Sequence, residues 1–297
     1  MAEIKQQEDS PLGLVLGMSA FLLWGLLPFL MKALSHISAY EVVAHRVIWS
    51  IPIVGVILIV TRRTSDIKAA FRSPKTLGMA VICSFLISVN WGIYVWAISV
   101  GKTMETSMGY YITPLLAILI GATILGEKLN NGQKLSSVIA AIAVAILAWD
   151  LGAVPWVSLG LAGSWSIYAF LRKTLPIGAN QGFMLEVLIL FIPAVCLIIW
   201  LTSTGQSHFG PTGLNDILLL MFCGVATAVP LMLFTNATRQ IRMATIGILQ
   251  FIAPSIIFLV AVFAFDEPFN QVKLVAFVLI WIAMAIFGYT IIKKQKA

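Results

Sequence analysis

The chain carries ten apolar stretches, each long enough for a helix that crosses a bilayer, which takes about 20 residues. Only 10 % of the 297 residues are charged, against about 25 % in a soluble domain. So much apolar surface cannot be buried by a soluble fold of this length. A membrane barrel would instead show short alternating segments. We therefore expect an all-α polytopic membrane protein. The ten predicted transmembrane helices are 11–34, 39–61, 74–98, 104–126, 132–150, 154–173, 179–201, 214–236, 242–265 and 270–292.

The basic residues are unevenly distributed over the connecting segments. With the N-terminus inside, 15 of the 19 Lys and Arg residues fall in inner segments. Only Lys32, Lys102 and Lys273 lie at outer ends. Positively charged loops stay on the cytoplasmic side of a membrane. We therefore expect both termini in the cytoplasm. The net charge of +7 is explained by this orientation and does not indicate nucleic-acid binding.

Two residue pairs of the first half of the chain recur in the second half. A proline followed by a glutamate in the fourth span recurs with the same spacing in the ninth, and a tryptophan followed by a lysine in the first span recurs with the same spacing in the sixth. The shift along the chain is nearly equal for the two pairs. They are Pro114 and Glu127, Pro254 and Glu267, Trp24 and Lys32, and Trp165 and Lys173. The recurrence indicates two five-helix repeats, 11–150 and 151–292. Because five is odd, the second repeat is inverted, which places a solute site between the halves.

Three ionisable residues, Glu41, His45 and Arg46, lie near the start of the second span. Glu41 and His45 are four residues apart and share a helix face. An unpaired charge at bilayer depth costs about 3 kcal/mol or more, so Arg46 needs a partner or a function. Snorkelling to the headgroups is the alternative. With the N-terminus inside, the three residues lie in the outer half of the membrane. We expect them to form a polar lock or outer gate.

Polar and aromatic side chains within the other spans are candidates for a central cavity. A buried amide finds no hydrogen-bond partner in hydrocarbon, so it faces another helix or a wet cavity. Aromatic rings suit a flat amphipathic solute or a cation. Hydrogen bonds and packing between helices are the alternatives. The candidate binding residues are Asn90, Trp91, Tyr94, Tyr110, Trp165, Tyr168 and Gln250. Among these, Asn90, Tyr94, Tyr110 and Gln250 are the preferred ones.

Two prolines in the interior of spans are candidate hinges. Pro114 cannot donate to the carbonyl of Tyr110, and Pro254 cannot donate to that of Gln250. Each leaves an acceptor beside a polar side chain. A passive kink is the alternative interpretation.

Motifs of soluble enzymes are missing from the sequence. It contains no GxSxG, HExxH, Walker or dinucleotide-binding pattern. We expect no enzyme activity, no cofactor and no metal site. Without a phosphate-binding loop, the energy for any transport comes from a solute or ion gradient. The sequence assigns no oligomeric state.

Seven sequence blocks resemble the RarD family, an EamA-type branch of the drug/metabolite transporter superfamily. They are WGLLPFLMKAL, EVVAHRVIWS, NWGIYVWAI, SMGYYITPLLAILIGATILGEKL, SIYAFLRK, ATAVPLMLFTNATRQI and GILQFIAPSIIFLVAVF. The blocks keep their order along nearly the whole chain. The resemblance implies two inverted EamA-like repeats in a bacterial inner-membrane secondary transporter. Proteins of this family are named as chloramphenicol-sensitivity permeases, and related superfamily members export small metabolites.

The leading hypothesis is therefore a secondary-active permease, an exporter, that moves a small organic metabolite or drug-like solute by alternating access. Its partners are then the solute and the lipid bilayer. A non-transporting sensor or assembly subunit is the main alternative. A membrane enzyme that acts on lipid is a third hypothesis, for which Glu41 and His45 are the only candidate acid–base pair.

Overall fold

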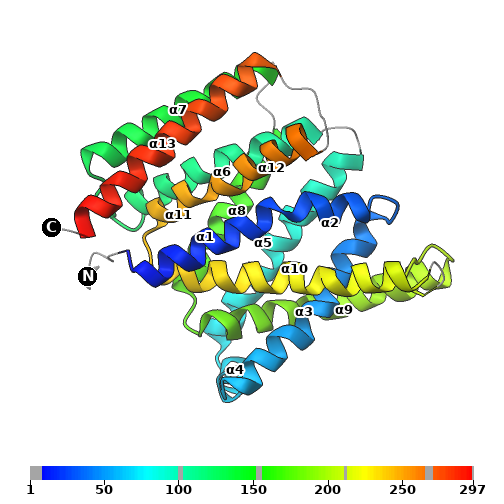
Figure 1. Cartoon of the computed structure of the whole chain (residues 1–297). Helices are drawn as coiled ribbons and strands as arrows, with labels where there is room; N and C mark the ends of the chain where they lie inside the picture. The colour runs from blue at the N-terminus through cyan, green and yellow to red at the C-terminus, as the bar shows by residue number, and fades with distance from the viewer. Residues whose placement is uncertain (1–8, 100–102, 152–155, 211–212, 265–269, 296–297) are drawn as a thin grey trace.

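The computed structural model describes residues 9–99, 103–151, 156–210, 213–264 and 270–295. Over these ranges the chain forms thirteen helices and no strand (Figure 1). Their bounds are α1 Pro11–Gly25, α2 Leu27–Ala33, α3 Ala39–Val60, α4 Ser65–Phe71, α5 Pro74–Ser99, α6 Thr103–Thr123, α7 Asn131–Leu151, α8 Trp156–Thr174, α9 Ala179–Ser203, α10 Leu214–Thr238, α11 Met243–Gln250, α12 Ile252–Ala264 and α13 Gln271–Gln295.

Seven helical segments among the described residues are long and apolar enough to cross a membrane. They include α1 with α2 taken together, and α11 with α12 taken together. Two shorter apolar helices, Gly109–Thr123 and Leu274–Thr290, lie within α6 and α13. The prediction of an all-α polytopic membrane protein is confirmed.

The structure divides two of the predicted spans. The first span breaks at Leu26, just before Pro28 in the first turn of α2. Proline has no N–H to donate to the carbonyl of Trp24, so the α-helical pattern is interrupted there. The ninth span breaks at Phe251, shortly before Pro254. By contrast, α6 is continuous through Pro114. The short helix α4 lies in the connection between α3 and α5, where the pattern of apolar spans predicts no helix.

The helices pack as a bundle in which distant parts of the sequence meet. The C-terminal helix α13 lies along α7 at one side, and α6 packs against α8 and α11 (Figure 1). On the other side, α3 packs between α9 and α10. The beginning of α1 and the end of α13 lie at the same end of the bundle, and the α2–α3 and α9–α10 turns lie at the opposite end (Figure 1).

A close backbone contact joins α6 to α11. A Cβ added at Gly247 would lie 2.6 Å from the carbonyl oxygen of Pro114 and 2.7 Å from the Ile118 side chain. No side chain larger than hydrogen fits here without displacing one of the helices. Gly247 therefore allows α11 to pack closely against α6 next to Pro114.

The carboxylates of Glu127 and Asp9 accept hydrogen bonds from residues at the start of α11. Glu127 accepts from the backbone N–H groups of Met243 at 2.7 Å and Ala244 at 2.9 Å. Asp9 accepts from the Arg242 guanidinium at 2.6 and 2.8 Å. A negative charge at a helix N-terminus is favourable because it meets unpaired N–H groups and the positive end of the helix dipole. Glu127 therefore ties the end of α6 to the beginning of α11.

Candidate functional site

The side chain of Arg46 contacts two neighbouring helices, α5 and α10. It lies on α3, about two turns from the helix start at Ala39, which Ser38 caps by accepting from the Glu41 N–H. Its Nε donates to the hydroxyl of Thr227 on α10 at 2.8 Å. Its guanidinium carbon lies 5.1 Å from the ring centroid of Trp91 on α5. Thr227 is near the middle of α10, so the charge lies well inside the membrane-spanning bundle.

The position of Arg46 depends on a close contact between α3 and α10. A Cβ added at Gly224 would lie 2.4 Å from the backbone of Trp49. The hydroxyl of Ser50 donates to the carbonyl oxygen of Arg46 at 2.6 Å. The same hydroxyl lies 3.4 Å from the carbonyl oxygen of Gly224. Because Thr227 follows Gly224 by one turn, this contact brings its hydroxyl within reach of the guanidinium.

Two tyrosines lie near Arg46. The rings of Tyr94 on α5 and Tyr110 on α6 lie 6.3 Å apart, and both are neighbours of the Arg46 side chain. Tyr110, within α6, is 46 % exposed. We call this cluster of side chains, which consists of Arg46, Trp91, Tyr94, Tyr110 and Thr227, the Arg46 chamber.

The Arg46 guanidinium has no counter-ion in the part of the chain that the structure describes. Its side-chain contacts there are the Thr227 hydroxyl and the Trp91 ring. Arg172, whose side chain is fully buried in the bundle, instead forms an ion pair with Glu186 at 3.1 Å. A charge in a membrane-spanning segment is costly unless it is paired or reaches water. Because Arg46 has no counter-ion among the described residues, its guanidinium keeps N–H donors that a ligand can use.

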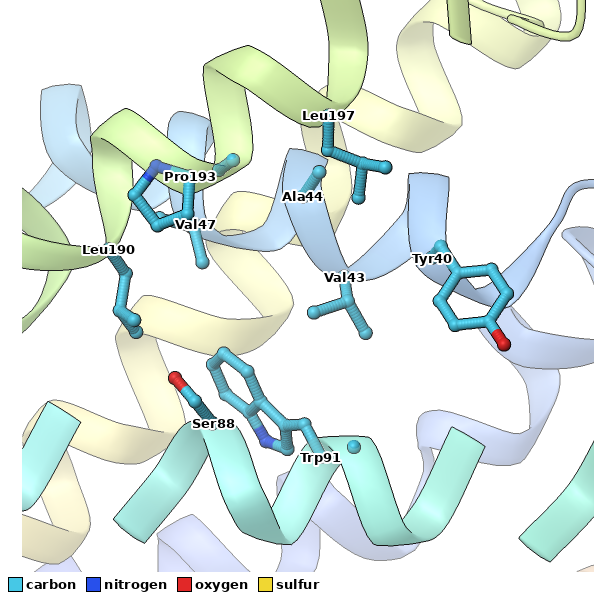
Figure 2. A pocket seen from close by; sticks show the side chains of 11 residues that line it. Tyr40, Val43, Ala44, Val47, Ser88, Trp91, Leu190, Pro193 and Leu197 are labelled. Carbon is cyan, nitrogen blue, oxygen red and sulfur yellow. The ribbon is translucent and has the colours of Figure 1, made fainter. Parts of the chain in front are cut away.

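An apolar pocket of about 230 Å³ lies between α3, α5 and α9, and Trp91 lines it as well (Figure 2). In Figure 2 the Trp91 indole projects from α5 between Val43 of α3 and Leu190 of α9. Ser88 and Tyr40 supply the only hydroxyls in this lining. The full lining is Tyr40, Val43, Ala44, Val47, Ser88, Trp91, Gly92, Leu190, Pro193, Ala194 and Leu197.

Glu41 and His45 point away from the chamber, toward the α9–α10 loop. The Glu41 carboxylate is fully buried and accepts from the Ser207 hydroxyl at 2.9 Å and from the His208 N–H at 2.7 Å. The His45 ring stacks on Phe209 with centroids 4.7 Å apart. Glu41 and His45 thus contact the α9–α10 loop, whereas Arg46 points toward α5 and α10.

The other candidate residues lie in contacts between helices. Asn90 donates at 2.9 Å to both the Leu161 carbonyl and the Ser164 hydroxyl of α8. Trp165 packs against the rings of Trp24 and Phe234, each 5.5 Å away. The Gln250 side chain is buried at the end of α11, and its Nε2 has no partner among the described residues.

Tyr168 belongs to a buried polar cluster with Arg172 and Glu186, which the sequence did not predict. Its hydroxyl donates to the Glu186 carboxylate at 2.9 Å. Arg172 pairs with the same carboxylate and donates to the Ala179 carbonyl at 2.6 Å. The signal available in the sequence was a charge in each of two consecutive spans, separated by a short turn. Within the described residues, no three His, Cys, Asp or Glu side chains gather into a metal-binding group.

Comparison with known proteins identifies the class of molecule that holds this chamber. The EamA-like transporter family profile matches residues 11–149. "Protein RarD" of Streptomyces exfoliatus is 36% identical, covering 99% of this chain and 93% of its own length. An "Uncharacterized transporter" of Vibrio cholerae is 36% identical over 98% and 96% of the two chains. "Protein RarD" of Escherichia coli is 34% identical over 96% of each.

The chain therefore belongs to the RarD family of EamA-like transporters, and the resemblance seen in its sequence blocks is confirmed. One solved crystal structure superposes with a TM-score of 0.72 at 17% identity, covering 95% of this chain and 98% of that chain. That likeness shows a shared fold. At the level of a multi-pass membrane transporter, the functional expectation is also confirmed.

Proposed function

We propose that the protein is a secondary-active transporter that carries a small organic solute by alternating access, with the Arg46 chamber as its binding site. The observation that carries this proposal is a cationic and aromatic chamber at mid-bundle, built by α3, α5, α6 and α10. Such a site, enclosed by helices from distant parts of the chain, is typical of secondary transporters.

The spacing of the helices supports two inverted repeats, 11–150 and 151–292. Helices α3, α5, α6 and α7 begin at residues 39, 74, 103 and 131. Helices α9, α10, α11 and α13 begin at 179, 214, 243 and 271, so each follows its counterpart by one constant interval. With α1 and α2 matched to α8, and α11 and α12 matched to α6, this correspondence yields ten crossings.

Contacts between helices support the same correspondence. The packing of α6 on α8 has its counterpart in α12 on α1, and that of α3 on α10 in α9 on α5. Helices α7 and α13, which correspond to each other, pack together. Trp24 and Trp165 occupy corresponding positions, and their rings touch. Residues that contact their own counterparts lie on the axis that relates two repeats.

The orientation that we propose has both termini in the cytoplasm of a bacterial cell, with the protein in the inner membrane. It follows from the excess of Lys and Arg in the inner segments. The common end of α1 and α13 is then cytoplasmic, and the loop held by Glu41 is external (Figure 1).

Each candidate residue has a role in this proposal. Arg46, Trp91, Tyr94 and Tyr110 contact the solute, and Glu41 and His45 form an outer lock through the 207–209 loop. The free amide of Gln250 is available to a solute when α11 and α12 move about the Phe251 break. The remaining residues, Asn90, Trp165, Tyr168, Pro114 and Pro254, position the moving helices.

The test is reconstitution into liposomes with a panel of metabolites, with and without a proton gradient. One relative, 32% identical, carries the name "Chloramphenicol-sensitive protein RarD" in Pseudomonas aeruginosa, so the panel includes chloramphenicol. We expect gradient-driven movement of at least one solute, in the outward direction. A protein that moves none of them under any gradient, yet isolates with a stable protein partner, would instead be a sensor or assembly subunit.

A further inference from the structure

We propose that the solute is an amphipathic organic carboxylate: its carboxylate binds Arg46, and its apolar body lies against Trp91 in the α3–α5–α9 pocket. This inference rests on the proposed function and specifies the chemical class of solute for the same site.

The free donors of Arg46 define the charge of the solute. Only its Nε is engaged, by Thr227, so the terminal nitrogens remain available within the described part of the chain. A guanidinium presents planar, parallel N–H groups that match a carboxylate with two hydrogen bonds. The neighbouring Tyr94 and Tyr110 are phenols and supply no counter-charge at neutral pH. An anionic group on the solute would supply the missing charge.

The pocket beyond Trp91 defines the body of the solute. Its lining consists mainly of aliphatic side chains, with Pro193 and the Trp91 indole, and its only hydroxyls are those of Ser88 and Tyr40. Its volume of about 230 Å³ is below the range of about 300–1,000 Å³ that is usual for drug-sized ligands. A solute with one ring or one short branched chain fits this volume.

Trp91 connects these two parts of the site. Its ring lies 5.1 Å from the Arg46 guanidinium carbon, and the same residue forms a wall of the pocket. Val43 and Val47 of the pocket flank Arg46 on α3, at about one turn and at one residue. In this proposal a single molecule places its carboxylate at Arg46, which is outside the pocket lining, and extends past Trp91 so that its apolar part contacts Val43.

Matched probes separate charge from shape. Binding to the purified full chain in phosphatidylcholine nanodiscs is measured with phenylacetate, its neutral isostere phenylacetamide and the cation phenethylamine, together with other aryl carboxylates and their amides. The variants are Arg46→Gln, Arg46→Lys and Val43→Phe. Arg63→Gln is the control, because Arg63 is exposed just beyond α3.

We expect at least one carboxylate to bind the wild type at least tenfold more tightly than its amide. Hydrogen bonds to charged groups predict a loss of about tenfold to a hundredfold in Arg46→Gln, for the carboxylate only. Arg46→Lys should keep the preference with weaker binding, and Val43→Phe should weaken carboxylate and amide alike by filling the pocket. Arg63→Gln should match the wild type. Arg46→Lys and Val43→Phe test the site if Arg46→Gln does not fold.

The inference is overturned if no carboxylate binds, if carboxylate and amide bind equally, or if Arg46→Gln keeps the preference. It is also overturned if phosphatidylglycerol added to the nanodiscs abolishes carboxylate binding, because the site would then hold a lipid headgroup. Transport of a neutral solute without carboxylate binding would refute this inference alone. Carboxylate binding without transport of any solute would refute the proposed function alone.

Discussion

Two arginines inside the bundle, Arg172 and Arg46, differ in their burial and in their hydrogen-bond and ion-pair partners. Arg172 has a fully buried side chain that is paired with Glu186 and bonded to the Ala179 carbonyl. Arg46 is half-buried, with a threonine hydroxyl and an indole ring as neighbours. The first arrangement satisfies the charge within the protein. The second leaves it available to a ligand.

Breaking the Arg172–Glu186 pair should destabilise the protein strongly. Glu186→Gln leaves a buried guanidinium without its counter-charge, and losses of this kind are about 3–5 kcal/mol. The double variant Arg172→Met with Glu186→Leu removes both charges and should cost less than the single change. Unfolding of each variant in detergent by denaturant measures the difference. If the double variant is less stable than Glu186→Gln, the prediction is wrong, and the ion pair adds net stability to the folded protein.

The sequence identifies candidate residues but not the partners that they meet in the fold. A charge within an apolar span is visible at once, so Arg46 was a candidate from the sequence alone. Its contact with Thr227 joins residues 181 positions apart and depends on how two helices pack. The separation of Arg46 from Glu41 and His45 was equally hidden, because a loop far along the chain takes up the two outer residues.

At the scale of the element, the contact between α3 and α10 sets the geometry of the chamber. Gly224 leaves no room for a side chain against the backbone of Trp49, whereas a Cβ at Gly163 in α8 would meet nothing within 4 Å. The two glycines lie within helices and provide a matched pair for substitution.

Gly224→Ala should lower stability by about 1–3 kcal/mol, because the added methyl overpacks the helix contact. It should also weaken solute binding, since Thr227 moves with α10 relative to Arg46. Gly163→Ala should be neutral or stabilising by up to about 1 kcal/mol, as expected for alanine in a helix. Thermal unfolding of the two variants in parallel provides the comparison. Equal stability of the two variants would contradict the close contact.

The α9–α10 loop is held to α3 by Glu41, which accepts from Ser207, His208 and Phe209. Glu41→Gln removes the charge and presents an amide donor to N–H groups. We expect hydrogen exchange in the 207–209 segment to accelerate about tenfold to a hundredfold, with transport lost and membrane insertion intact. Asp150→Asn, which alters an exposed carboxylate, is the control. Unchanged exchange in Glu41→Gln would argue against the lock.

The helices themselves were largely predictable, because hydrophobic length determines them in a membrane. The described bounds of α3, α5 and α7 lie within a residue of the predicted spans. The break at Leu26 was not predicted, whereas the break at Phe251 lies three residues before Pro254, one of the two candidate hinges. A proline near either break removes a backbone donor, but α3, α6, α9 and α10 contain prolines without breaking. A proline in the sequence therefore does not by itself predict an interrupted helix.

At the scale of the whole molecule, the proposed repeats explain why the chamber lies where it does. Corresponding helices meet across the bundle, and the tryptophans at corresponding positions touch on the line between the halves. Alternating access requires the halves to rock about this line, so that the chamber opens in turn to each side.

The most direct measurement is the accessibility of a cysteine placed in the chamber from each side of the membrane. Tyr110→Cys is introduced after Cys83, Cys196 and Cys223 are replaced by alanine, and a membrane-impermeant thiol reagent is applied to intact cells and to inverted vesicles. We predict modification from both sides, with a carried solute changing the two rates in opposite directions. Modification from one side only, under every solute and ion gradient, would contradict alternating access at the Arg46 chamber.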